Sequence, residues 1–188
     1  MRKAILISCL VAPSILHGQV AGPRLKPGLW EVRVVKQVVD GRNISAQLSD
    51  AARQMQQAMQ SMPPEQRARM EAMLQQHGVR QGAGGGYQVC ITATMAKRDA
   101  PVLPKEGHCR MSNVAHSGNR TTFAFSCKSR GTTTTGTGGA EITNEIVSTH
   151  TDATTRNAKG ETHTMHVESE MRYVKADCGD VKPPEQER

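Results

Sequence analysis

Alternation of apolar and polar residues is the feature that most limits what this chain can fold into. The stretch "GLWEVRVVKQVVDG" has apolar residues on one side of an extended chain and polar residues on the other. The apolar side comprises Trp30, Val32, Val34 and Val38, and the polar side comprises Glu31, Arg33 and Gln37. This period of two is typical of a half-buried β-strand, and Asp40-Gly41 ends the strand in a turn.

Similar stretches recur after residue 86, separated by short turns. In the last one, His163, Met165 and Met171 fall on one face and His166 on the other. The pattern predicts a mainly β (α+β) fold, with a curved antiparallel β-sheet or small barrel-like meander of about seven strands.

Residues 45–78 follow a helical period instead. Apolar residues recur three or four positions apart, Ser49 is suited to cap a first helix, and Pro63-Pro64 ends it. Pro64 fits the first turn of a second helix, which we expect to stop at Gly78 before the joint "GAGGG". The sequence thus predicts a helical hairpin inserted in the β domain, with an apolar stripe of Met55, Met59, Met62, Met70, Met73 and Leu74.

The N-terminus carries the three parts of a secretory signal: Arg2 and Lys3, an apolar run, and small residues up to Ala21. Lipidation at Cys9 is the competing interpretation, but it would leave few apolar residues before the modified cysteine. We therefore predict a signal peptide at 1–21, one β-rich domain at 22–178, and a flexible tail at 179–188. The mature protein should be periplasmic or secreted, without a permanent membrane span.

Four cysteines remain after the signal is removed, and none lies in a CxxC pair. In an exported chain this even set predicts two disulfides. If Ser117-Gly118-Asn119 is a three-residue turn, Cys127 lies opposite Cys109 in a hairpin, and a cross-strand disulfide can form. By elimination, Cys90 would pair with Cys178.

Charge and motifs favour a binding or structural protein over an enzyme. The formal net charge of +7 falls to +5 without Arg2 and Lys3, the basic residues are scattered, and five aromatic residues are too few for stacking on bases. We therefore expect no nucleic-acid partner. The chain has no GxSxG or HExxH motif, and "GTGGAE" lacks the helix that a phosphate loop needs, so no catalytic residue or cofactor is predicted.

A metal site is the alternative suggested by nine methionines and six histidines after the signal. His163 and Met165 share a strand face, and an imidazole with a thioether suits Cu(I). An ordinary strand is the favoured interpretation, because methionine fills irregular cores more often than it binds metal.

Seven segments occur in an order that resembles the family of exported proteobacterial proteins called domain of unknown function 3617. They are "LKPGLWEV", "SMPPEQRARMEAMLQQHG", "VCIT", "HCRMSN", "SGNRTTFAFSC", "GTGGAEIT" and "ADCGDVKP". The resemblance implies a small exported β-rich domain with no assigned reaction.

The leading functional hypothesis is a non-enzymatic envelope module whose concave sheet face binds or covers an apolar ligand or partner. An apolar sheet face left in water invites association, so it must be closed, covered or bound. For the resting state, the favoured interpretation is that the two hairpin helices only pack on each other or cap the sheet. The alternative is an arm that swings away to expose the concave face or to dock a partner. The expected partner is an apolar small molecule, a lipid, or another protein bound through the arm. The predicted ligand-binding residues are Trp30, Val32, Val34, Phe123, Phe125, Met165 and Met171.

Overall fold

The computed structural model describes residues 25–76, 79–82, 86–97, 108–143 and 145–183. The predicted signal peptide, Gly78, residues 83–85 of the "GAGGG" joint and residues 184–188 of the predicted tail lie outside these residues. No helix within them is long and apolar enough to span a membrane.

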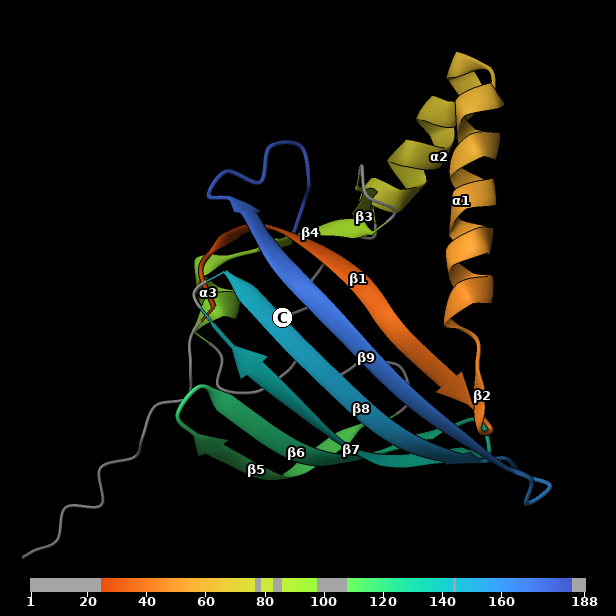
Figure 1. Ribbon diagram of the computed structural model, residues 1–188, viewed down its shortest axis with the longest axis vertical. Helices are drawn as coiled ribbons and strands as arrows, with labels where there is room; N and C mark the ends of the chain where they lie inside the picture. Colours follow the sequence, from red (N-terminus) through yellow and green to blue (C-terminus); the bar gives the residue numbers. More distant parts are fainter. Residues whose placement is uncertain (1–24, 77–78, 83–85, 98–107, 144, 184–188) are drawn as a thin grey trace, which may run out of the picture.

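The described strands form one nine-stranded antiparallel sheet in the order β3-β4-β1-β9-β8-β7-β6-β5, with β2 paired to β1 (Figure 1). This confirms the mainly β antiparallel fold. The two strands beyond the expected seven are both short, β2 and β3. The strands are β1 (Gly28–Val39), β2 (Arg42–Asn43), β3 (Val79–Gln81), β4 (Tyr87–Ile91), β5 (Arg110–Ser117), β6 (Arg120–Ser129), β7 (Thr132–Ile142), β8 (Ile146–Arg156) and β9 (Thr162–Lys175).

Strands β1 and β9, from opposite ends of the chain, lie side by side along their whole length. Val32 pairs with Met171, which pairs with Val147 on β8. Directly paired residues share a face of a sheet, so the registers define one face that carries Trp30, Met171 and Met165. We call it the apolar face. The opposite face carries Lys36, His166 and Glu168, and we call it the polar face.

A β-bulge at Val35 corrects the predicted faces of β1. Val34 pairs with Ser169 but Lys36 pairs with Glu168, so Val35 is an extra residue in the strand. An extra residue shifts every later side chain to the opposite face. Gln37 therefore lies on the apolar face and Val38 on the polar face, which reverses the assignment made from simple alternation.

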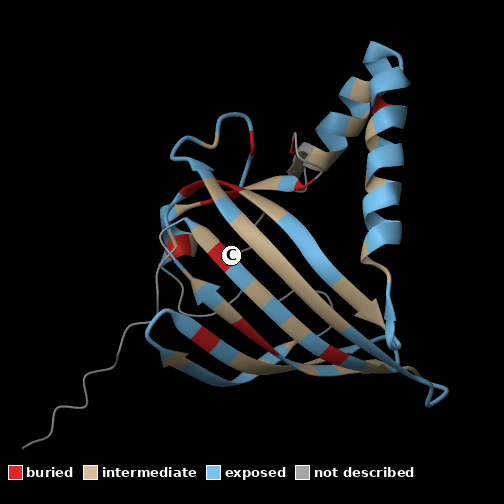
Figure 2. Cartoon of the chain, in the orientation of Figure 1, coloured by how far each residue is buried: buried red, intermediate tan, exposed pale blue. Residues whose placement is uncertain are grey.

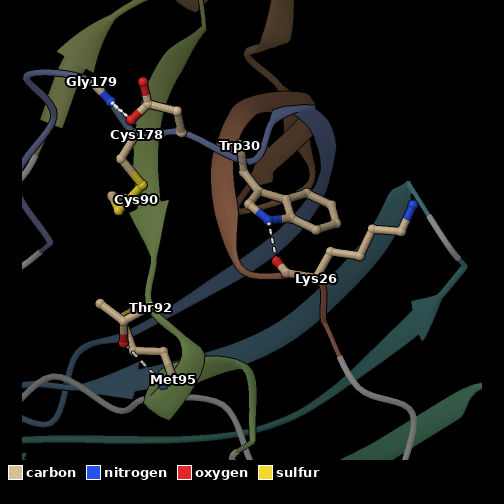
Figure 3. The surroundings of a disulfide bond; sticks show 8 residues. Lys26, Trp30, Cys90, Thr92, Met95, Cys178 and Gly179 are labelled. Carbon is tan, nitrogen blue, oxygen red and sulfur yellow. Dashed lines mark hydrogen bonds between the residues drawn. A yellow bond between two sulfur atoms is a disulfide. The ribbon is translucent and has the colours of Figure 1, made fainter.

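The buried core is concentrated at the β1 N-terminal end of the apolar face. Trp30 and Leu29 are fully buried, and Trp30 packs with Ile91, Val147 and Ala96. Trp30 Nε1 donates a hydrogen bond to the Lys26 carbonyl (Figure 3). The Trp30 ring also meets the Tyr173 ring edge-on, with 5.4 Å between the ring centroids. Elsewhere the strands consist mostly of half-buried and exposed residues, with single buried residues such as Thr121 and Ala153 (Figure 2).

A short helix, α3 (Ala93–Ala96), covers this core. Thr92 caps it by accepting a hydrogen bond from the Met95 N–H.

Two disulfides join Cys90 to Cys178 and Cys109 to Cys127, the pairing that the sequence favoured. The predicted three-residue turn is wrong, however. Ser117 pairs with Arg120, which leaves a two-residue turn, and an extra residue near Asn113 then shifts the register. Asn113 has a positive φ of 53° at this bulge. The bulge and the shorter turn cancel, so Met111 still lies opposite Phe125.

The chain just after Cys178 packs against the start of β1 and the end of β4. Val181 is buried with Leu29 and Cys90, and its N–H donates to the Cys178 carbonyl. Val181 therefore supplies part of a small second core, and the flexibility of residues 179–188 stays a prediction.

The helical hairpin consists of α1 (Ser45–Ser61) and α2 (Pro64–Gln76), and it extends away from the sheet beyond the edge of β1 (Figure 1). Helix α1 begins four residues before the predicted cap Ser49, and Ile44 occupies the cap position without a side-chain hydrogen bond. Arg67 on α2 donates to the carbonyls of Met59, Gln60 and Met62, which ties the two helices together.

Candidate binding groove between β1 and α1

A groove of about 600 Å³ runs between β1 and the N-terminal half of α1. Val32 and Val34 of β1 form one wall, and Leu48 and Ala52 of α1 form the other. Tyr87, at the start of β4, pairs with Val32 and lies at one end. The remaining lining residues are Arg33, Gln37, Ser45, Ser49, Arg53 and Gly86.

The apolar residues of this groove are unusually exposed. Val34, Tyr87 and Leu48 retain 45%, 43% and 41% of their surface, respectively. Large apolar side chains that converge on one concave surface, with a polar rim, are typical of binding sites rather than of isolated surface residues. This part of the molecule can therefore receive an apolar group without rearranging the core.

Two ends of α1 set the position of the groove. At the N-terminal end, Ser45 Oγ accepts a hydrogen bond from the Gln37 N–H, and the Ile44 N–H donates to the Gln37 carbonyl. Farther along, Met59 is buried against α2 and Arg67, whereas Met55 and Met73 are more than half exposed. The helical hairpin is thus held to β1 at its base, and much of its methionine stripe faces solvent.

The predicted ligand-binding residues share the apolar face but do not form one site. Trp30 is fully buried in the core, and Met171 packs against the same core, so neither lines a cavity. Of the seven, only Val32 and Val34 line the groove. The groove residues on α1 could be found from its apolar period, but Tyr87 had no signal beyond its place in a short strand.

Phe123 and Phe125 lie over glycines of the next strand. They pair with Gly138 and Gly136, and a Cβ at these two glycines would lie 2.5 Å and 2.7 Å from the respective ring. The missing side chains leave room for half-buried rings on the sheet. Strand β7 keeps a continuous register with both neighbours, so these glycines produce no bulge.

A second hollow, of about 650 Å³, lies at the other end of the sheet. Met165 is 40% exposed there, but most of its neighbours are polar residues of the polar face: Thr135, Thr137, Asp152, Thr154, Thr164 and His166. Its polar lining makes it a poorer place for an apolar ligand than the groove.

His166 links two strands on the polar face. Its Nδ1 lies 2.7 Å from Asp152 Oδ1 and its Nε2 lies 2.9 Å from Glu168 Oε1. Both ring nitrogens can donate only in the imidazolium form, so these carboxylates raise the pKa of His166 above its ordinary value of 6.5. In turn, His166 and Lys36 lower the pKa of Glu168.

The alternative metal pair, His163 and Met165, shares the apolar face as predicted. His163 Nδ1 lies 2.8 Å from Asp40 Oδ2, and this hydrogen bond raises the pKa of His163. Met165 Sδ lies 3.9 Å from Gln37 Nε2. No group of three His, Cys, Asp or Glu side chains in the described part of the chain could hold a metal ion. Binding of Cu(I) by the imidazole and thioether stays a prediction.

The fold and the disulfides define a class: a mainly β protein whose antiparallel sheet is stapled by two disulfide bonds. Such disulfides persist in oxidising compartments, which fits an extracellular or periplasmic protein.

The chain belongs to the family described as protein of unknown function (DUF3617), whose model matches residues 25–178. A Pseudomonas putida protein described as an uncharacterized protein in the lpd-3 5′ region is 36% identical over 114 residues, which is 60% of this chain and 73% of that relative. No solved structure matches the chain significantly.

Proposed function

We propose that this protein is an exported binding module that holds an apolar ligand or partner in the groove between β1 and α1. Cleavage of the N-terminal signal would deliver it to the periplasm or the exterior, where its disulfides form. The observation that carries the proposal is the cluster of exposed apolar residues, Val34, Tyr87 and Leu48, in one groove of the size of a small-molecule site.

The proposal narrows the site expected from the sequence. We assign binding to Val32, Val34 and the groove residues of α1 rather than to the whole apolar face, because Trp30 and Met171 belong to the core. Binding at the groove also gives the hairpin a role, since α1 supplies one wall.

The neutral fluorescent probe 1-N-phenylnaphthylamine tests the proposal. Val34→Asp places a carboxylate in the groove, and desolvation of that charge should weaken probe binding by about tenfold or more. Val35→Asp is the matched control, since Val35 is the next residue, is 60% exposed and does not line the groove. Circular dichroism checks that both variants are folded.

Equal binding by both variants would reject the groove as the site. Failure of the unmodified protein to enhance probe fluorescence, with native mass spectrometry showing no co-purified apolar molecule, would reject the proposed function itself.

A further inference from the structure

The middle of β1 has a strand partner on only one side. Strand β9 follows β1 throughout, but on the other side β4 pairs only with Gly28–Val32 and β2 only with Val38–Val39. Gln37 is bonded on that side to Ile44 and Ser45 at the base of α1. Among the described residues, no strand pairs with residues 33–36 on the side of the groove.

Gly86 lies beside β1 immediately before β4 begins at Tyr87. The N–H of Gly82, which follows β3, donates to the Gly86 carbonyl. A Cβ on Gly86 would lie 2.5 Å from the Val32 carbonyl oxygen, so only glycine fits this close to β1. The space beside residues 33–36 is left to the groove and spans roughly 13 Å at about 3.3 Å per residue.

A groove between a free strand edge and a helix matches the needs of an extended peptide. Main-chain groups of β1 can pair with the peptide, and alternate peptide side chains can enter the apolar wall. A purely aliphatic ligand would instead cover the free N–H and C=O groups without bonding them, which is unfavourable.

The charges of the groove define the peptide further. Among its lining residues only Arg33 and Arg53 carry charge, and both are basic. Their acidic partners, Glu31 and Asp50, are local neighbours in the sequence that do not line the groove. The Arg53–Asp50 pair is exposed on both sides, and Arg33 is half exposed although Glu31 is not. Exposed ion pairs contribute little to stability, so acidic groups on a ligand can compete for the two arginines.

We propose that an extended peptide segment of another protein adds to the sheet beside β1, with apolar residues at alternate positions and acidic residues at its ends. This inference rests on the proposed binding function and specifies the class of partner. The peptide lies beside residues 33–36 of β1, in line with β4, and α1 forms the other wall of its site.

The test uses the full oxidised protein and a fluorescein-labelled peptide of five residues. Valine stands at alternate positions, threonine between, and glutamate at both ends. Two further copies carry N-methyl groups on one or the other set of alternate amides. Only one set can face β1, so we expect one methylated copy to bind about tenfold more weakly and the other to bind as the parent does. Lysine in place of both glutamates should weaken binding by about fivefold.

The outcomes separate this inference from the proposed function. If both methylated copies bind like the parent while the naphthylamine probe is displaced, the groove binds apolar groups without strand addition, and only the inference fails. If the probe binds but the peptide does not, the inference also fails alone. A dimer that forms with rising protein concentration and resists the peptide would assign the β1 edge to a second copy and overturn the inference.

Discussion

The two halves of β1 have opposite surroundings. From Gly28 to Val32 the strand lies between β4 and β9, and Leu29 and Trp30 are fully buried. At residues 33–36 it keeps only β9, before β2 pairs with Val38–Val39 on the other side, and Val34 and Val35 retain 45% and 60% of their surface. One strand thus anchors the core with its first five residues and presents a free edge at residues 33–36. Stability and binding can therefore be altered separately.

The largest effect on stability should come from the Cys90–Cys178 disulfide, beside the part of β1 that has strands on both sides. Replacing Cys90 and Cys178 by alanine removes a disulfide between residues 88 positions apart in the sequence. Replacing Cys109 and Cys127 removes one between residues 18 positions apart. The chain-entropy relation gives losses of about 4.6 and about 3.2 kcal/mol, respectively. Urea unfolding of the two double variants measures the difference. A larger loss of unfolding free energy for the Cys109 and Cys127 variant would show that the Cys90–Cys178 disulfide is not the more stabilising one.

Trp30→Ala should lose about 4 kcal/mol, because it removes the largest buried side chain and its hydrogen bond to Lys26. Val34→Ala, on the same face of the same strand, should lose less than about 1 kcal/mol because Val34 is already exposed. Chemical denaturation of both variants tests this contrast. Similar losses would mean that the groove is part of the core.

Removal of the hairpin should have a small effect on stability. Replacing residues 45–78 by a short Gly-Ser linker leaves both disulfides and the Trp30 core in place, so we expect intact β-type circular dichroism and a cooperative melt. The apolar probe should no longer bind, since Leu48 and Ala52 are gone. A molten product, or one with wrongly paired cysteines, would show that the hairpin is part of the core.

The smallest effect concerns pH and the two histidines of β9, His163 and His166. His166 and His163 both have a raised pKa in the folded protein, so their stabilising contribution is complete below about 6.5 and is lost as pH rises through the raised values. Glu168 has a lowered pKa, so its contribution is present above 4.5 and is lost as pH falls through the lowered value.

His166→Asn should reduce the fall of the melting temperature above pH 6.5 without abolishing it, because His163 and Asp40 still interact. Salt should weaken the effect, since these groups are exposed. Melting curves between pH 5.5 and 9, at low and high salt, provide the measurement. An unchanged pH profile in the variant would show that the imidazolium bridge does not stabilise the fold.

Local patterns in the sequence were sufficient for much of the fold. Alternation predicted the strands, a helical period predicted both helices of the hairpin, and the cysteine pairing followed from the β5–β6 register. That pairing was reached through a wrong turn length, because a two-residue turn and a bulge near Asn113 compensate each other.

The groove could not be predicted because it depends on non-local pairing. Periodicity places Val34 on the apolar face. It does not show that the pairing of β4 with β1 stops at Val32, or that β1 lies beside β9. It also misses the extra residue at Val35, which moves Gln37 to the apolar face. Trp30 illustrates the same limit, since a buried core residue and a ligand-binding residue have the same pattern.

Amide hydrogen exchange along β1 tests the difference between its two halves most directly. In the free protein, both sets of alternate amides from Leu29 to Val32 should exchange only through global unfolding, because each has a strand partner. Within residues 33–36, the amides that point away from β9 should exchange orders of magnitude faster. Uniform slow exchange from Gly28 to Val39 would contradict a free edge at the groove.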